Sequence, residues 1–306
     1  RSRIPLAPHD FNLPRVFAAQ AGAQPSRAWL LQRQGPARAW TPLSYAEAQR
    51  KAQSIAQWLL DRGLGAGRPI LVLSGNSIAH ALVRLGGLTA GIPACPVSAN
   101  YGLLDPSFER LRHVVRRLQP GMVFVEHAAP FGRALEAVDF GDAPIVTRTP
   151  AEAPGPAIAL EEVLATPATG AVAARVASLA PGDPAACMLT SGSTGPPKIV
   201  LQSYANLAAN VAQANQALGR AACWGGTTMD WLPWSHVSGA FAPLLTLVAG
   251  GSLYIDEGKP VPGPLWEQSL QNLREVPGPY YVNVPLGYAL LADALEADAS
   301  LRATFF

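Results

Sequence analysis

Apolar residues alternate along the chain between two spacings. Over residues 48–60 they recur every third or fourth position, behind Ser44-Tyr-Ala-Glu47, which has the form of a helix capping box. Residues 70–73 are apolar throughout, and this run is too short for a helix. The pattern therefore predicts an amphipathic helix followed by a buried strand.

The same alternation continues to the end of the chain. It predicts helices over residues 78–89, 105–118, 204–218, 240–248 and 265–276, and strands over 92–97, 122–125, 186–190, 227–230, 252–255 and 280–282. Residues 147–184 are rich in Ala, Pro, Gly and Thr and show helical spacing only over 160–164, so we expect a surface connection or a loosely structured segment there. Strands that alternate with helices indicate an α/β fold with mostly parallel sheets flanked by helices.

Composition narrows the class of protein. The 306 residues are 49% hydrophobic and 14% charged, which indicates a core-rich folded chain and excludes disorder for most of it. No apolar stretch reaches the roughly 18 uncharged residues of a membrane span, and no signal-peptide pattern opens the chain. We therefore expect no membrane span and a cytoplasmic location.

Charged residues and cysteines exclude further classes. The formal net charge is +2, and the basic residues are scattered, so no nucleic-acid surface is expected. Three cysteines, Cys95, Cys187 and Cys223, form no C-x-x-C pair, which favours buried free thiols over disulfides or zinc. Lysine is much rarer than arginine in this sequence. The three lysines are Lys51, Lys198 and Lys259.

The strongest chemical signal is the loop Thr190-Ser-Gly-Ser-Thr-Gly-Pro-Pro-Lys198. Its glycines let the backbone approach a ligand, its hydroxyls and N–H groups can hold phosphate oxygens, and Lys198 adds a positive charge. A Gly/Ser-rich surface turn is the alternative explanation. Pro197 and Ile199 on either side of Lys198 exclude a Walker A loop, and dinucleotide-binding, nucleophile-elbow and zinc-protease motifs are missing from the sequence.

The loop resembles the signature T-S-G-[ST]-T-G-x-P-K of the adenylate-forming superfamily, which includes acyl-CoA synthetases, peptide-synthetase adenylation domains and luciferases. Ile199 departs from that pattern, because the family usually has glycine after the lysine. A second block, Asp230-Trp-Leu-Pro-Trp-Ser-His236 with residues 250–260, resembles the feruloyl-CoA synthase branch. The resemblance extends from about residue 14 to the end of the chain.

The resemblance implies the fold and its division. We expect a truncated AMP-binding N-terminal domain over residues 1–306, made of two α/β subdomains. One would span approximately residues 67–220, and the other would pack residues 1–66 with 221–306. The small C-terminal lid domain, the adenylation lysine, and the adenine, ribose and metal contacts would lie beyond Phe306.

The resemblance also implies an acid–thiol ligase. Such an enzyme uses ATP and Mg²⁺ to convert a carboxylic acid into an acyl-adenylate, and then transfers the acyl group to CoA. Lys198 and His236 would be the catalytic residues, with His236 bordering the acyl site, although a core histidine is the alternative for the latter. The β- and γ-phosphates would be held by Thr190, Ser191, Gly192, Ser193, Thr194, Gly195 and Lys198.

The identity of the acid stays open at this point. Five aromatic residues concentrate in the region that resembles the acyl pocket and would suit a hydroxycinnamate such as ferulate, although core packing also explains them. They are Trp231, Trp234, Phe241, Tyr280 and Tyr281. A benzoic or a medium- or long-chain fatty acid is not excluded by these residues.

Two other classes of function are open. One is a non-catalytic nucleotide- or acyl-binding module. The other is a hydrolase or acyltransferase that uses Ser191 or Ser193 with His236 and Asp230, which the missing nucleophile elbow disfavours. Partners would be a small-molecule acid, ATP and CoA, and a homodimer is compatible with the family. This chain alone is predicted to be inactive.

Overall fold

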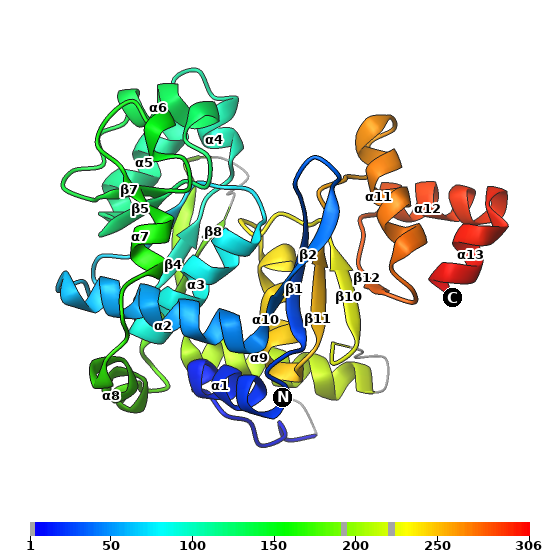
Figure 1. Cartoon of the computed structure of the whole chain (residues 1–306), viewed down its shortest axis with the longest axis horizontal. Coiled ribbons are helices and arrows are strands. Elements are labelled where there is room, and N and C mark those ends of the chain that lie inside the picture. The colour runs from blue at the N-terminus through cyan, green and yellow to red at the C-terminus, as the bar shows by residue number, and fades with distance from the viewer. Residues whose placement is uncertain (1–3, 191–194, 220–223) are drawn as a thin grey trace.

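The computed structural model describes residues 4–190, 195–219 and 224–306, and two β-sheets organise them (Figure 1). The larger sheet has the strand order β7-β6-β5-β3-β4-β8-β9. Its strands are β3 (Ile70–Val72), β4 (Ala94–Pro96), β5 (Met122–Phe124), β6 (Ile145–Thr147), β7 (Ile158–Ala159), β8 (Pro184–Thr190) and β9 (Lys198–Ser203). All neighbours in this sheet are parallel except β8 and β9, which form an antiparallel hairpin.

The smaller sheet joins distant parts of the chain, in the order β12-β10-β11-β1-β2. Its strands are β1 (Ala28–Gln34), β2 (Ala39–Ser44), β10 (Thr227–Asp230), β11 (Ser252–Ile255) and β12 (Tyr280–Tyr281). The N-terminal hairpin β1–β2 is antiparallel, and β1 continues the sheet by pairing in parallel with β11. The expected α/β fold with parallel-rich sheets is thus confirmed, whereas subdomain boundaries near residues 66 and 220 stay a proposal.

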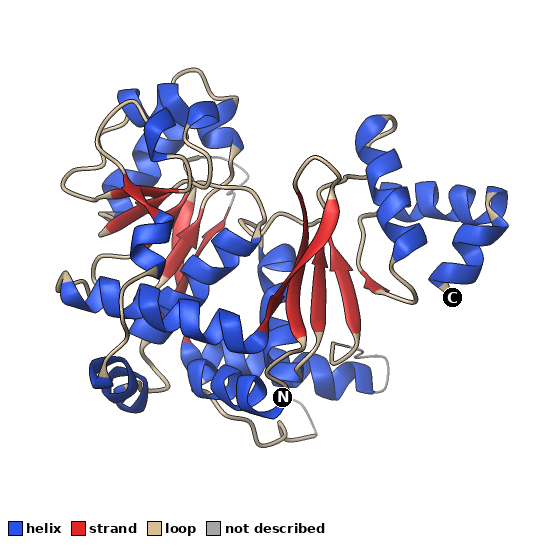
Figure 2. Ribbon diagram, viewed as in Figure 1, coloured by secondary structure: helices blue, strands red, loops and turns tan. Residues whose placement is uncertain are grey.

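Helices surround both sheets (Figure 2). They are α1 (Leu13–Ala23), α2 (Tyr45–Asp61), α3 (Ile78–Ala90), α4 (Asn100–Leu103), α5 (Glu109–Leu118), α6 (Gly132–Ala137), α7 (Leu160–Leu164), α8 (Gly170–Ser178), α9 (Tyr204–Leu218), α10 (Val237–Ala249), α11 (Pro264–Glu275), α12 (Pro285–Ala297) and α13 (Ala299–Phe305). The start of α2 is as predicted, because the Ser44 hydroxyl accepts a hydrogen bond of 3.2 Å from the Glu47 N–H. Helices α11 to α13 extend from the outer edge of the smaller sheet, at the right of Figure 1.

The segment from 147 to 184 differs from the expectation of a loose connection. It contains β7, α7 and α8, and the hydroxyl of Thr169 caps α8 by accepting from the Ala171 N–H. Arg175 of α8 donates to the Ala90 carbonyl at 3.0 Å, which ties this helix to the end of α3. The sequence does not predict α8, because its small residues give no clear apolar periodicity. Tertiary contacts hold this helix in place instead.

One continuous hydrophobic core connects the two sheets. It includes Trp29 and Leu30 of β1 on one side and Ile70 and Val72 of β3 on the other, with α2, α3, α9 and α10 between them. Separate clusters fill the outer face of the larger sheet and the space under α11 to α13. Cys95 and Cys187 are buried free thiols, as expected, while Cys223 lies outside the described residues.

Helices α2 and α3 approach each other closely inside the shared core. A Cβ atom placed on Gly86 of α3 would lie 2.4 Å from Cγ2 of Ile55 in α2, well inside van der Waals contact. Ile55 is β-branched and fully buried, so it has little freedom to move aside. Glycine at position 86 therefore sets how closely the two helices approach.

Substituting Gly86→Ala should lower the free energy of unfolding by about 1–3 kcal/mol, because the added methyl group overpacks the core. Gly22→Ala in α1 is the matched control, since nothing lies within 4 Å of its added Cβ and a small gain is expected there. Urea unfolding of both variants measures the difference. Equal stability of the two variants would contradict the close-packing argument.

Candidate functional site

A cleft of about 330 Å³ lies where four parallel strands end, two from each sheet. The segments that line it follow the carboxyl ends of β3, β4, β10 and β11, and they cover residues 74–76, 98–100, 231–236 and 256–259. Ligands of open parallel sheets bind at such carboxyl ends, because the loops there diverge and expose backbone polar groups. The cleft is therefore the first candidate for a functional site.

Asn76 connects the two walls of the cleft. Its side-chain amide donates to the Leu232 carbonyl at 2.8 Å and accepts from the Trp234 N–H at 2.9 Å. Gly239 permits a second close contact, since a Cβ there would lie 2.3 Å from the Leu232 carbonyl oxygen. The Asn76 bonds fix the 231–236 segment, which carries the predicted histidine, against the larger sheet, and Gly239 lets α10 pack closely on the same segment.

His236 is exposed and lines the cleft at the N-cap of α10. Its backbone N–H donates to the Pro233 carbonyl at 2.9 Å, so the turn before α10 presents the side chain. This position excludes the alternative of a buried core histidine. Lys259, within the 250–260 block, is exposed in the same cleft, and its sequence motif alone predicts no role for it.

The histidine that is buried is His80, which supports the wall behind the cleft. Its ring packs edge-on against Trp234, with 5.0 Å between ring centroids, and its Nδ1 donates to the Gly75 carbonyl at 2.8 Å. Burial, together with the nearby charge of Arg84, lowers the pKa of His80 to about 3. His80 is therefore neutral near pH 7 and holds Trp234 in position.

The predicted phosphate loop is the turn of the β8–β9 hairpin. Thr190 and Lys198 face each other in register at its base and are both exposed, while Ser191, Gly192, Ser193 and Thr194 lie outside the described residues. Gly195 has φ +131°, a conformation that other residues rarely adopt. The loop leaves the sheet beside the end of β4, because β8 is the parallel neighbour of β4.

A histidine of helix α5 anchors the exit of this loop. Nε2 of His113 in α5 donates to the Pro197 carbonyl at 3.1 Å. Pro197 is buried, in contrast to the exposed Lys198 beside it. The exit of the loop is thus held by packing and by one hydrogen bond, while its lysine stays available to a ligand.

A buried carboxyl group stabilises the part of the cleft that follows β11. Asp256 accepts hydrogen bonds of 2.8 Å from the Gly258 N–H, 2.7 Å from the Ser269 hydroxyl and 2.8 Å from the Asn272 amide. Asn272 in turn accepts from Arg33 at 2.8 Å. Burial raises the pKa of Asp256, although these donors oppose the shift.

A second buried carboxyl group ends β10. One oxygen of Asp230 accepts from the Leu232 N–H at 3.2 Å, and the other is buried without a hydrogen-bond partner among the described residues. Burial raises the pKa of Asp230 to about 8, and the negative charge of Asp256 adds to the shift. Asp230 is therefore largely protonated near pH 7.

The predicted aromatic residues do not gather in one pocket. Trp231 and Trp234 line the cleft, and Tyr280 lines a smaller cavity beside β10. Tyr281 belongs to the core under α11 to α13. Phe241 lines a third, apolar cavity.

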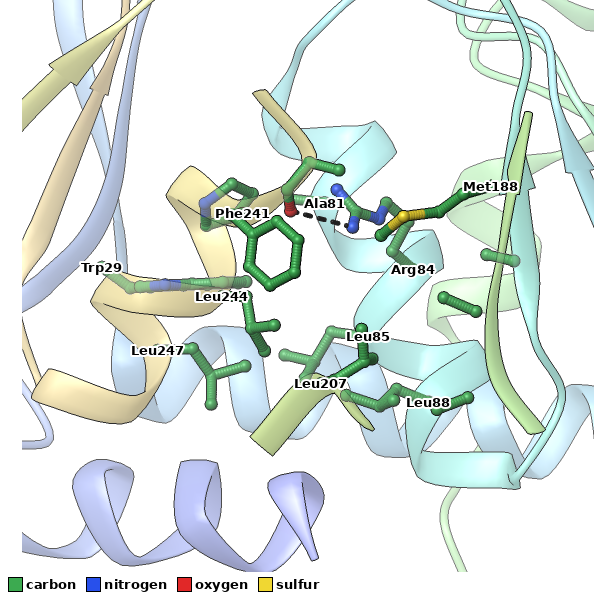
Figure 3. A pocket seen from close by; sticks show the side chains of 15 residues that line it. Trp29, Ala81, Arg84, Leu85, Leu88, Met188, Leu207, Phe241, Leu244 and Leu247 are labelled. Atoms are coloured by element: carbon green, nitrogen blue, oxygen red, sulfur yellow. Dashed lines mark hydrogen bonds between the residues drawn. The ribbon is translucent and has the colours of Figure 1, made fainter. Parts of the chain in front are cut away.

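That third cavity, of about 60 Å³, lies between α3, α9, α10 and β8 (Figure 3). Arg84 enters this otherwise apolar space and donates to the Ala240 carbonyl at 3.2 Å. The volume is well below the ~150 Å³ of an apolar cavity that accepts benzene. As the structure stands, the cavity has room for a short apolar segment only.

The described residues contain no group of three or more His, Cys, Asp or Glu side chains that could hold a metal ion. Among the same residues, no helix is both long enough and apolar enough to cross a membrane.

Replacing Asp230 with Asn should stabilise the protein more as the pH rises. Above pH ~4 the unfolded chain releases the Asp230 proton, whereas the folded protein keeps it up to about pH 8, so the wild-type protein loses stability across this range. The advantage of Asp230→Asn should grow from pH 5 to pH 8, by at most about 1.4 kcal/mol per pH unit. Urea unfolding at several pH values measures it.

Asp142→Asn is the control for this titration. The neighbouring Arg68 lowers the pKa of exposed Asp142, so that group changes charge below the tested range. Its difference from the wild-type protein should stay constant between pH 5 and pH 8. Parallel curves for Asp230→Asn and the wild-type protein would show that Asp230 titrates normally.

Comparison with known proteins places the chain in a family. The sulfoacetate–CoA ligase of Cupriavidus necator is 28% identical over 249 residues, which cover 79% of this chain and 44% of that protein. The L-proline–[L-prolyl-carrier protein] ligase of Streptomyces coelicolor is 30% identical over 219 residues, covering 69% of this chain and 37% of that protein. The chain thus spans less than half the length of these relatives.

Solved structures share the fold. The crystal structure of VinN matches with a TM-score of 0.73 at 19% identity, over 96% of this chain and 66% of that one. A long-chain-fatty-acid-CoA ligase from Archaeoglobus fulgidus matches with a TM-score of 0.74 at 18% identity, over 97% and 56%. The family model for AMP-binding enzymes matches residues 17–296, and the chain therefore belongs to the AMP-binding enzyme family.

Proposed function

We propose that the whole protein is an acid–thiol ligase that activates an aryl carboxylic acid with ATP and transfers the acyl group to CoA. A hydroxycinnamate such as ferulate is the proposed substrate. In the first step a carboxylate oxygen attacks the α-phosphorus of ATP, and the bond to pyrophosphate breaks. In the second step the CoA thiol displaces AMP and forms the thioester.

The observation that carries this proposal is the cleft shared by the two sheets. The reaction must bring a carboxylate and a triphosphate together, and the carboxyl ends of β3, β4, β10 and β11 supply one cleft for both. Two exposed basic groups, His236 and Lys259, lie in that cleft. The ammonium group of Lys259 supplies a positive charge and the imidazole of His236 supplies a hydrogen-bond donor, and both favour the anionic acid and the developing charge of the transition state.

The hairpin loop is proposed to hold the departing phosphates. Lys198 would meet the charge of the β- and γ-phosphates, aided by Thr190 and Gly195 and by residues 191–194, which lie outside the described part of the chain. The anchor from His113 to Pro197 supports this role, because a fixed donor loses less freedom when the ligand binds. His236 is proposed to orient the carboxylate and later to accommodate the thiol.

The contacts of Asp230 disfavour a serine hydrolase. A catalytic triad needs a carboxylate that orients the histidine. Asp230 instead accepts from the Leu232 N–H, and its second oxygen has no partner among the described residues, so it does not bond to exposed His236. Asp230 is also largely protonated near pH 7 and would stabilise an imidazolium poorly.

A fatty-acid substrate is a weaker candidate. The apolar cavity of Figure 3 is the observation in its favour, but its volume of about 60 Å³ is too small for a long chain without rearrangement. A non-catalytic binding module would need neither exposed Lys198 nor exposed His236. We therefore place these two alternatives behind an aryl-CoA ligase.

ATP-dependent ligases of this kind use Mg²⁺ with the nucleotide. The described residues supply no cluster of carboxylates or histidines for a metal ion. A metal that is bound mainly by substrate phosphates and water does not require such a cluster. No role of this chain's own residues in binding Mg²⁺ is therefore assigned.

In the whole protein, Lys198→Ala should slow pyrophosphate exchange about a hundredfold, because one charged donor to the transition state is lost. Lys51→Ala is the matched control, since Lys51 lies on α2 away from the cleft and pairs with Glu47 at 2.7 Å. Pyrophosphate exchange assays with ATP, labelled pyrophosphate and 4-hydroxycinnamate measure both variants. Equal rates for Lys198→Ala and Lys51→Ala would remove the loop from the mechanism.

The 306-residue chain assayed alone should give negligible pyrophosphate exchange, because it spans only 44% of its sulfoacetate–CoA ligase relative. The whole protein, assayed beside it with ATP and a panel of carboxylic acids, should be active. Robust adenylate formation by the chain alone would show that residues 1–306 suffice for the first step.

A further inference from the structure

A cavity of about 80 Å³ lies between β10, β12 and α10, next to the cleft. Thr228 and Asp230 of β10 line it together with Ser238 of α10, and the rings of Trp224 and Tyr280 meet at its wall with 4.3 Å between centroids. The cavity and the cleft share one segment of chain. Asp230 and Leu232 line the cavity, whereas residues 233–236, including His236, line the cleft.

Three residues of this cavity carry buried polar atoms that lack hydrogen-bond partners in the described ranges. They are Nε1 of Trp224, Oγ1 of Thr228 and Oδ2 of Asp230, in side chains that are 4%, 5% and 4% exposed. Each such atom destabilises the folded protein when it is left unpaired. Because folded proteins pair most of their buried polar groups, three such atoms around one cavity indicate a place for a polar ligand group.

The three atoms define the chemistry of that group. Trp224 offers a donor, the Thr228 hydroxyl offers both a donor and an acceptor, and the free oxygen of Asp230 offers an acceptor or, when protonated, a donor. A hydroxyl group can accept from Trp224 and from protonated Asp230 and can donate to Thr228. An ammonium group would leave the Trp224 N–H unpaired, and a carboxylate would have no cation to meet among the residues that line the cavity.

The volume also limits what can enter. About 80 Å³ accepts one small polar group with its adjoining atoms rather than a whole substrate. The aromatic edge formed by Trp224 and Tyr280 suits an aryl carbon that bears such a group. The reacting carboxylate of the same molecule would then lie on the His236 side of the shared segment.

We propose that this cavity binds a hydroxyl group at the end of the acyl substrate remote from its carboxylate, and that Trp224, Thr228 and Asp230 set a preference for hydroxylated acids. The inference rests on the proposed acid–thiol ligase function and adds the residues that select the substrate. It predicts discrimination between two acids that differ only in the remote hydroxyl group.

Isothermal titration calorimetry with 4-hydroxycinnamate and cinnamate tests the proposal directly. The wild-type protein should bind the hydroxylated acid at least about tenfold more tightly, because cinnamate leaves the buried groups unpaired. Thr228→Val, which removes the hydroxyl and keeps the shape, should bring this ratio close to one. Trp224→Phe, which removes only the N–H donor, should lower it as well.

Thr89→Val is the matched control. Thr89 is a buried threonine of α3 whose hydroxyl donates to the Leu85 carbonyl at 2.8 Å, and it does not line the cavity. It should keep the wild-type ratio. If Thr228→Val fails to fold by urea unfolding, Trp224→Phe decides the outcome.

Three results would overturn the proposal. They are equal affinity of the wild-type protein for the two acids, no binding of either acid, and an unchanged affinity ratio in both cavity variants. Pyrophosphate exchange by the whole protein separates this failure from that of the function. Adenylate formation with both acids at equal kcat/KM leaves the ligase function standing without the cavity's role. Selective binding without adenylate formation from any acid supports the cavity's role and refutes the ligase function.

Discussion

The close packing of α2 against α3 at Gly86 holds the two sheets in a fixed relation, because both helices belong to the core that the sheets share. The hairpin β1–β2 enters the smaller sheet immediately before α2, and α2 then leads back to β3 of the larger sheet. The relative position of the strand ends therefore depends on this core. Asn76, which bonds to both Leu232 and Trp234 across the cleft, then fixes the two walls.

The sequence predicts most of the elements that surround this core. Continuous apolar runs such as 70–73 and 122–125 identify the buried strands β3 and β5, and Ser44 identifies the start of α2. The hairpin β1–β2 and strand β9 are not predicted, because their polar and apolar residues do not alternate. Residues 28–31 are apolar and 32–34 are polar, and residues 199–201 form one short apolar run. Helix α8 is not predicted, because its alanines supply little hydrophobic periodicity. It is held in place by hydrogen bonds to distant parts of the chain, from Asn12 to the Val176 carbonyl and from Arg175 to the Ala90 carbonyl.

The residues of the site also differ in how far the sequence predicts them. The motif around Lys198 could be read from local sequence, because it needs only its neighbours in the chain. A place for His236 at the site was implied only by the family resemblance, since its local sequence also suits a core histidine. The roles of Asn76 and Asp256 depend on partners far away in sequence, such as Trp234 and Asn272. The unpaired atoms beside β10 could not be predicted at all, since a sequence does not show which buried polar groups lack a partner.

A crystal structure of the whole protein with a non-hydrolysable 4-hydroxycinnamoyl-adenylate analogue tests the central claim, that the two sheets build one acid-activating site. We predict that the phosphate of the analogue lies in the cleft beside His236 and that its phenol hydroxyl lies beside Thr228 and Asp230. An analogue bound with its acyl group in the apolar cavity of Arg84 and Phe241, or away from the strand ends altogether, would contradict it.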